Sequence, residues 1–352
     1  MKERLHFWDN YKGVLIFLVV LGHFLYSYAL RMDGGLADLI VTFIYSFHMP
    51  AFVFCSGYLS KSERSRSMTY LTKLLIYYLI FNTITMLYDR FVDGGTIAFL
   101  TPYYSFWYIL SLIAWRLGIK KLAKVKGIVP LSFIICLVLG FWGEFTNVLS
   151  IRRTICFFPF FLIGYLFDAE RFNSFIKKRN WKTILLGALF VAIVTAATIC
   201  FVVVKNVTIT MLLYGTYSNV TDAIMRVILI AIAVCFIIGM MLVVPNVKVP
   251  ILTNIGKNSL LIYLVHRIIT LVYCKFLSAG SYNHWYLMFA FIASVLTCVV
   301  LGNNRLNMWF DSGVSHIAVE IGSNSKKGKI TIGVMLIIFI LLLCVNPLSI
   351  VL

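Results

Sequence analysis

Charged side chains are scarce in this chain of 352 residues, and acidic ones are the scarcest. Charged residues make up 12% of the sequence, with 31 Lys and Arg against 13 Asp and Glu. Hydrophobic residues make up 61%, and the mean hydropathy is +0.94. A soluble domain of this length cannot bury that much apolar surface. The composition therefore predicts an all-α, polytopic membrane helical bundle.

The sequence also lacks the motifs that would turn its net charge of +18 into a nucleic-acid surface. Its basic residues form short clusters between apolar runs, with no RNA- or DNA-binding motif beside them. There is no CxxC pair and no Cys-rich loop, and all eight cysteines lie within apolar runs, where cysteine behaves as a small hydrophobe. We therefore expect no nucleic-acid partner, no metal site and no disulfide framework.

Long polar connections, internal repeats and a signal-peptide cleavage site are missing too. The first apolar run has no A-x-A sequence after it, so we interpret it as a retained span. No connection is long enough to hold a soluble domain. We expect one membrane-embedded domain over residues 1–352, with any chemistry inside or at the edge of the bundle.

The apolar residues form runs near the 20 or so residues that a helix needs to cross the bilayer hydrocarbon. Lys and Arg concentrate in every second connection. Because cytoplasmic connections carry the excess of these residues, we expect a cytoplasmic N-terminus and, with eleven spans, an external C-terminus. The eleven runs are 13–30, 37–59, 70–88, 103–118, 127–143, 148–167, 183–204, 221–244, 252–274, 285–302 and 330–350.

Some basic residues remain inside or at the edges of these runs, where an unpaired charge is costly. Carboxylates are almost absent there: Asp222 and Glu144 are the nearest to Arg152 and Arg153, and both lie close to the outer ends of their helices. Such cations indicate an anionic ligand, a phosphate or a carboxylate, or else they mark the membrane interface. The seven are Lys73, Arg116, Arg152, Arg153, Arg226, Lys257 and Arg267.

Three of the six histidines fall at one depth of the predicted bundle. His23 lies eleven residues beyond Lys12, roughly 16 Å along a helix that rises 1.5 Å per residue. His48 and His266 lie about as far from the inner ends of their own spans. A common depth near the midplane predicts a shared polar cavity, although a single membrane histidine more often serves packing or hydrogen bonding.

Lys12 and His23 also share one face of the first helix, because eleven residues are close to three helical turns. Asp9, three residues before Lys12, is placed to form an ion pair with it. Imidazole takes and returns a proton near neutral pH. The first helix is therefore expected to carry an ion pair at the cytoplasmic mouth and a proton-transfer group at mid-depth.

Five segments, in order along the chain, resemble motifs of the acyltransferase-3 family of membrane proteins. "WDNYKG…VVLGH" resembles the opening signature, in which ten residues separate an arginine from a histidine. "FHMPAFVFCSGYL", "FWYILSLIAWRL", "RRTICFFPFFLIGY" and "GKNSLLIYLVH" are most similar to the fucose 4-O-acetylase-like branch, which also holds biofilm-polysaccharide modifying proteins. The motif core extends over about residues 4–302, and the run 330–350 follows it.

The resemblance implies an enzyme of the bacterial plasma membrane. It would take an acetyl or other short acyl group from cytoplasmic acetyl-CoA or another acyl-CoA, and place it on a hydroxyl of a cell-envelope or exported polysaccharide. The implied partners are acyl-CoA, a glycan or lipid-linked saccharide acceptor, and membrane lipid. A homo-oligomer is compatible with this interpretation.

The resemblance places His23 at the family's catalytic histidine and Lys12 where the family has arginine. Lysine keeps the charge but cannot form the bidentate fork to a phosphate. Either a point charge suffices here, or Lys12 mainly orients Asp9. The other motif positions are Ser56, Trp107, Arg153, Ser259, Tyr263 and His266, and His48 and Arg152 join the candidates through their depth and charge.

We expect the cationic cytoplasmic mouth to bind the CoA phosphates. His23 then acts as general base on the acceptor hydroxyl, or is itself acylated and relays the group. Arg152 and Arg153, nearer the outer face, suit an anionic acceptor or the thioester region. The mouth residues are Lys12, Lys61, Lys73, Arg116 and Lys257.

Two other classes of function also place polar groups inside a membrane bundle. A transporter or flippase of a lipid-linked sugar or polysaccharide is the main alternative. The sequence has no inverted repeat and no matched pair of Gly/Pro-broken helices to favour it. A scaffold in a polysaccharide-synthesis complex would leave the common depth of the histidines unexplained.

Overall fold

A computed structural model describes residues 6–29, 35–95, 97, 100–142, 148–277 and 285–322. Within these ranges the protein is all-helical, with no strand, which confirms the predicted class. The predicted run 330–350 lies outside the described residues.

Each of the other predicted runs coincides with a helix or a pair of helices. The run 252–274 is divided in two, with a bend of 82°. The helices are α1 (Phe7–Ala29), α2 (Leu36–Leu59), α3 (Met68–Val92), α4 (Trp107–Leu122), α5 (Ile128–Val138), α6 (Ile151–Leu166), α8 (Trp181–Lys205), α10 (Val220–Val243), α11 (Pro250–Lys257), α12 (Ser259–Leu277) and α13 (Trp285–Leu301).

Three further helices lie outside the predicted runs: α7 (Ala169–Lys178), α9 (Ile209–Leu212) and α14 (Asn304–Gly322). They are short or amphipathic, so they carry no long apolar run. Single 3₁₀ turns cover Arg64–Arg66, Leu139–Phe141 and Val148–Ser150.

Five helices of the described chain are long and apolar enough to cross a membrane, and up to seven spans result if each of two bent pairs crosses as one. The five are α2, α3, α6 together with the 3₁₀ turn before it (Val148–Leu166), α8 and α10, and the pairs are α11 with α12 and α13 with α14. Several apolar helices of this length mark a membrane protein. The count of eleven spans and the side of the N-terminus stay predictions.

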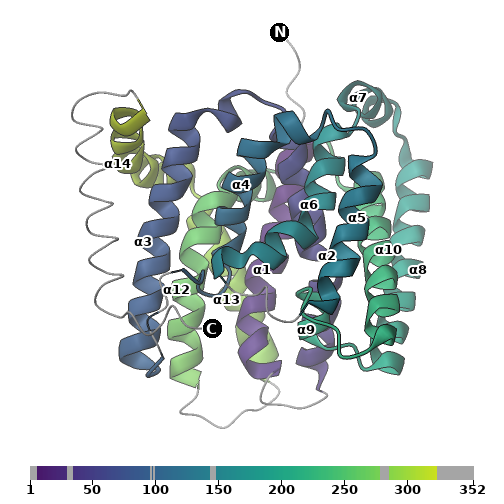
Figure 1. The fold of residues 1–352 in the computed structure, drawn as a ribbon, viewed down its shortest axis with the longest axis horizontal. Coiled ribbons are helices and arrows are strands. Elements are labelled where there is room, and N and C mark those ends of the chain that lie inside the picture. The colour runs from purple at the N-terminus through teal and green to yellow at the C-terminus, as the bar shows by residue number, and fades with distance from the viewer. Residues whose placement is uncertain are drawn as a thin grey trace.

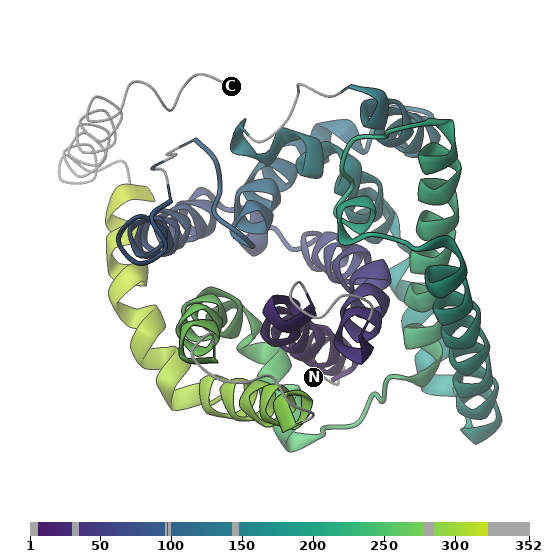
Figure 2. The same cartoon turned by 90° about the horizontal axis from the view of Figure 1, so that it is seen from below.

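Helices α1 and α2 lie inside a ring formed by the other helices, as the view along the bundle shows (Figure 2). Their inner position is reflected in burial. Four large side chains of α1 are fully buried: Tyr11, Leu15, Ile16 and Phe24. Helix α2 is buried along most of its length. The first helix is therefore surrounded by protein on most sides, which shields the polar groups it carries.

Glycines allow two helix pairs to approach at backbone distance. A Cβ at Gly57 of α2 would lie 2.0 Å from the carbonyl oxygen of Phe161, and one at Gly164 of α6 would lie 2.0 Å from that of Phe54. Gly256 of α11 meets the backbone of Asp9 in the same way. These glycines belong to the segments "CSGYL", "FLIGY" and "NIGKN", so close helix packing accounts for them.

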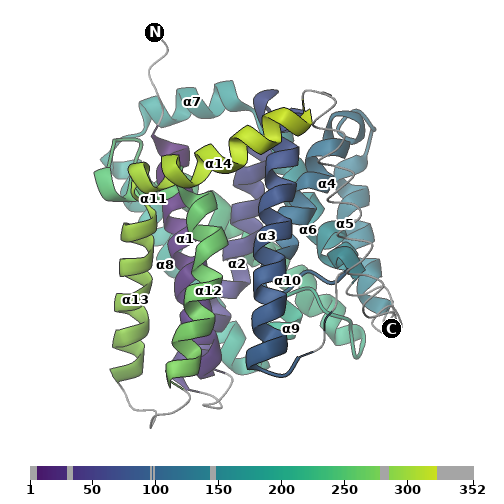
Figure 3. The same ribbon diagram turned by 90° about the vertical axis from the view of Figure 1, so that its left-hand side faces the viewer.

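One end of the bundle collects the basic connections, α7 and α14 (Figures 1 and 3). The described chain begins at this end, and α14 lies across α3 there. Lys73 of α3 pairs with Asp311 of α14, and Tyr77 donates to the same carboxylate at 2.9 Å. We call this end the basic end of the bundle.

Candidate active site

A cavity of about 180 Å³ lies in the middle of the bundle, where the sequence predicts one. Its wall combines residues from helices far apart in the chain, so no single motif encodes it. Two of the three mid-depth histidines line it, and the third lies against them. The lining is Val19, His23 and Tyr26 of α1, Tyr45, His48 and Met49 of α2, Tyr104 and Ser105, Trp107 of α4, Arg153 of α6, Leu213, and Tyr263 and Arg267 of α12.

His23 faces two partners across the helix interfaces. The hydroxyl of Tyr45 lies 3.4 Å from its Nδ1, and the ring of His266 lies 5.2 Å away between centroids. The ring of His48 continues the group, 4.9 Å from that of Tyr45. The structure thus brings the three histidines together, with His23 and His48 in the cavity lining and His266 against His23.

The three histidines differ in what fixes their protons. Nδ1 of His48 lies 2.8 Å from the carbonyl of Ile44, and Nδ1 of His266 lies 3.0 Å from that of Ile262. A carbonyl only accepts, so both rings carry their hydrogen on Nδ1. His23 has a hydroxyl partner, which can donate or accept, and it is also the most exposed of the three. His23 is thus the ring whose tautomer can change during a reaction.

Two arginines share this cavity with the histidines. The guanidinium of Arg153 lies 5.6 Å from the centre of the Trp107 ring, and that of Arg267 lies 3.8 Å from the centre of the Tyr104 ring. The lining contains no Asp or Glu. The described wall therefore carries positive charge that no lining carboxylate neutralises.

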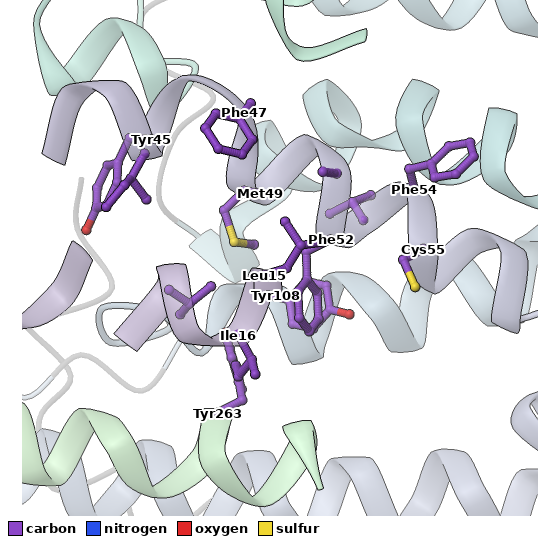
Figure 4. Packing of buried hydrophobic residues seen from close by; sticks show 14 of the residues in the cluster. Leu15, Ile16, Tyr45, Phe47, Met49, Phe52, Phe54, Cys55, Tyr108 and Tyr263 are labelled. Atoms are coloured by element: carbon purple, nitrogen blue, oxygen red, sulfur yellow. The ribbon is translucent and has the colours of Figure 1, made fainter. Parts of the chain in front are cut away.

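Several motif residues hold the helices together around the cavity, and one of them, Tyr263, also lines it. Ser56 Oγ and Tyr108 Oη are 2.5 Å apart, which ties α2 to α4. Tyr263 donates to the carbonyl of Ser105, which ties α12 to the start of α4. Figure 4 shows Phe52 beside Tyr108, with ring centres 5.5 Å apart, and Tyr263 near them, 5.3 Å from Tyr108.

The predicted ion pair on α1 is confirmed. Lys12 Nζ lies 3.4 Å from Asp9 Oδ1, and both side chains are largely buried. Gly256 touches the backbone of Asp9, so Lys257, the next residue, lies at the same end of the bundle. The cavity lining does not extend to Lys12, because Leu15 and Ile16 lie between them in the packed core.

The other predicted mouth cations have partners of their own. Arg116 donates through Nε to Ser60 Oγ at 2.9 Å and lies over the ring of Tyr70. Lys61, in the turn after α2, donates to the carbonyl of Phe167, and burial lowers its pKa below the ordinary value. With Lys73 held by Asp311, these contacts hold the basic end together.

Two predicted site residues lie away from the cavity. Arg152 donates to the carbonyl of Trp142 at 3.3 Å. Ser259 is buried at the first position of α12, beside the bend. Asp222, considered as a partner for the arginines, instead caps α10 by accepting from the backbone of Ser218 and Asn219. Glu144 lies outside the described residues.

The structure adds three cavity residues that were not among the candidate site residues: Tyr45, Tyr104 and Arg267, the last of which the sequence analysis names only among the seven cations in or near the apolar runs. For two of them the sequence contained a pattern that could have pointed to the cavity. Tyr45 lies three residues before His48, on the same helix face, and Arg267 is an unpaired cation directly after His266. Tyr104 lies in a connection, and only the fold brings it to the cavity.

Metal-binding geometry is not found in the described ranges. No group of three or more His, Cys, Asp or Glu side chains is placed there to hold an ion. The chemistry available at the cavity is proton transfer by imidazole and binding of anions by guanidinium groups.

Comparison with known proteins agrees with this chemistry. A family model described as an acyltransferase domain matches residues 5–303. Nodulation protein NolL of Sinorhizobium fredii (strain NBRC 101917 / NGR234) is 26% identical over 194 residues, 49% of this chain and 52% of that protein. The chain thus spans about half the length of this curated relative, and no solved structure matches it. The family model covers most of the chain, and this helical membrane protein therefore belongs to the acyltransferase-3 family.

Proposed function

We propose that this protein transfers an acetyl or other short acyl group from cytoplasmic acyl-CoA to a hydroxyl of a cell-envelope or exported polysaccharide. It would act in a bacterial plasma membrane, within the fucose 4-O-acetylase-like branch of its family. One observation carries the proposal: His23 faces a buried cavity beside Tyr45 and two arginines.

His23 acts as general base in this proposal. It accepts the proton of the acceptor hydroxyl as that oxygen attacks the thioester carbonyl. The carbon–sulfur bond then breaks, and the proton passes to the leaving thiolate. The hydroxyl of Tyr45 can accept from Nδ1–H, which leaves Nε2 to take that proton and stabilises the imidazolium that forms. A general base of this kind typically contributes about 10²- to 10⁴-fold to the rate.

The acyl donor enters from the basic end. Lys12, Lys257 and the free terminal nitrogen of Arg116, which has no partner among the described residues, offer charge for the CoA phosphates. The acyl group then has to pass the packed side chains of Leu15 and Ile16 to reach His23. Movement of α1 against its neighbours is therefore part of the proposed cycle.

The experiment compares membranes that contain the wild type, His23→Ala or His316→Ala, supplied with labelled acetyl-CoA. Envelope glycans are then analysed by mass spectrometry for one added acyl unit. We expect His23→Ala to lower incorporation by about 10²-fold or more. His316→Ala, an exposed histidine of α14, should match the wild type.

Three results would go against the proposal or against the general-base step in it. Undiminished acylation with His23→Ala would remove the general base from the mechanism. Glycan that accumulates inside cells lacking the gene, without any change in acylation, would favour the transporter or flippase. Covalently acylated protein trapped after acetyl-CoA is added without acceptor would favour the histidine relay over direct transfer.

A further inference from the structure

We propose that Arg153 and Arg267 form a subsite for an anionic group, a carboxylate or a phosphate, on the acceptor sugar. This rests on the proposed function and names its substrate class: an acidic glycan rather than a neutral one. The sequence motifs do not require it, because Arg267 follows the last motif residue, His266.

The charge balance of the cavity is the first step of the argument. Both guanidinium groups line the same cavity as His23, and Arg267 is only 7% exposed. Among the described residues neither arginine forms an ion pair, and no Asp or Glu lines the wall. Two cations that line one cavity inside a membrane bundle are costly unless an anion joins them.

Arg267 is oriented as a ligand-binding group. Its guanidinium lies 3.8 Å above the Tyr104 ring, and Tyr104 is anchored by its hydroxyl on Asp89 at 2.9 Å. Stacking fixes the plane of the guanidinium and leaves its edge available for hydrogen bonds. Its Nε has no hydrogen-bond partner in the described part of the chain. A planar carboxylate or a phosphate suits that edge.

Arg153 supplies the second charge from α6, another helix of the cavity wall. It lies in the first turn of α6 and is positioned over Trp107, the first residue of α4. The contact shown for its guanidinium among the described residues is the face of the Trp107 ring, which leaves its hydrogen-bond donors available to a ligand.

Position along the bundle assigns the anion to the acceptor. The end of the bundle opposite the Asp9–Lys12 pair contains the first residues of α4 and α6 and the last residues of α3 and α12. An ion pair between Lys275 and Asp93, at 3.2 Å, joins α12 to the end of α3 there. Arg153 lies in the first turn of α6, away from the donor end. Arg267 begins at the level of His266, but its guanidinium stacks on Tyr104, which bonds to Asp89 near the far end of α3. Both charged groups are therefore directed to the side of His23 away from the donor. A charged group there belongs to the molecule that arrives from the other side.

The test measures binding with the full-length protein in nanodiscs of phosphatidylcholine, which adds no anionic lipid. The probes are D-glucuronate, N-acetylglucosamine 1-phosphate and the neutral sugar glucose, and calorimetry gives their Kd values. The wild type should bind at least one anionic sugar about tenfold or more tighter than glucose. The carboxylate and phosphate arms show which anion the subsite prefers.

Variants assign that preference to the two arginines. Arg153→Gln and Arg267→Gln should each abolish it, while Arg267→Lys, which keeps the charge without the fork, should retain part of it. Arg90→Gln removes an exposed charge at the end of α3 and should leave the Kd values unchanged. Thermal unfolding of each variant shows whether the fold is retained, and Arg267→Lys decides the question if Arg267→Gln does not fold.

Three results would overturn the subsite: equal Kd values for the three sugars, a preference that survives both Gln substitutions, or an Arg267-dependent preference for succinyl-CoA over acetyl-CoA. The last would place the anion on the donor. Acyl transfer by the wild type is scored separately. Anion preference without transfer would contradict the proposed function alone, and transfer without anion preference would contradict the subsite alone.

Discussion

His23 differs from its two neighbouring histidines by a single contact. His48 and His266 each donate Nδ1–H to a carbonyl one helical turn earlier, which fixes their protons. The hydroxyl of Tyr45 gives His23 a partner that works in either direction. Spacing along the helices placed all three at one depth, and only the motif resemblance selected His23. The contact that sets His23 apart could not be predicted, because it depends on a side chain from another helix.

Tyr45→Phe tests that contact. Loss of one hydrogen bond typically costs about 1 kcal/mol, so we expect acyl transfer to fall about fivefold, with little change in the apparent affinity for acyl-CoA. The measurement is initial rate against acetyl-CoA concentration. Tyr78→Phe, a buried tyrosine of α3 outside the cavity lining, is the control. A rate equal to the wild type in Tyr45→Phe would show that the hydroxyl does not assist His23.

At the scale of elements, the family-like segments mark helix contacts as much as chemistry. Gly57 and Gly164 bring α2 and α6 to backbone distance, and Ser56, beside Gly57, bonds to Tyr108. The break between α11 and α12 also depends on a contact with another part of the chain. Asn258 donates to the carbonyl of Gly302 at 2.7 Å and to Asn304 at 2.9 Å. The predicted single span 252–274 missed the break because these partners are distant in sequence.

Gly57→Ala and Gly164→Ala test the contact between α2 and α6. Each added Cβ meets a carbonyl oxygen at 2.0 Å, and backbone cannot yield as a side chain can. Overpacking of this kind typically costs about 1–3 kcal/mol, so we expect a lower midpoint of thermal unfolding in detergent.

Gly313→Ala is the matched control for these variants. Nothing lies near its Cβ in α14, and alanine favours a helix over glycine by about 1 kcal/mol. Its midpoint should stay equal or rise. Midpoints for Gly57→Ala and Gly164→Ala that match this control would show that α2 and α6 are not packed so closely.

At the scale of the whole molecule, the basic connections gather at one end of the bundle together with α7 and α14 (Figures 1 and 3). The positive-inside rule then predicts which membrane face that end occupies. The donor and acceptor routes of the proposed reaction depend on this assignment.

Cysteine labelling in intact cells tests the sidedness. In a variant without native cysteines, we expect Asn219→Cys, before α10, to react with an impermeant maleimide added outside. Lys124→Cys, after α4, should react only once the membrane is opened. Labelling of Lys124→Cys from outside would reverse the predicted orientation and exchange the donor and acceptor ends.

The sequence by itself determined the membrane class, the helical runs, the Asp9–Lys12 pair and the common depth of three histidines. These depend on composition and on spacing within one helix, both of which are local. Only the tertiary structure decided that Tyr45 meets His23, that Arg267 stacks on Tyr104, and that Arg153 faces the same cavity. Such contacts join residues far apart in the chain, and they depend on how closely the helices approach, which glycine contacts and side-chain hydrogen bonds set.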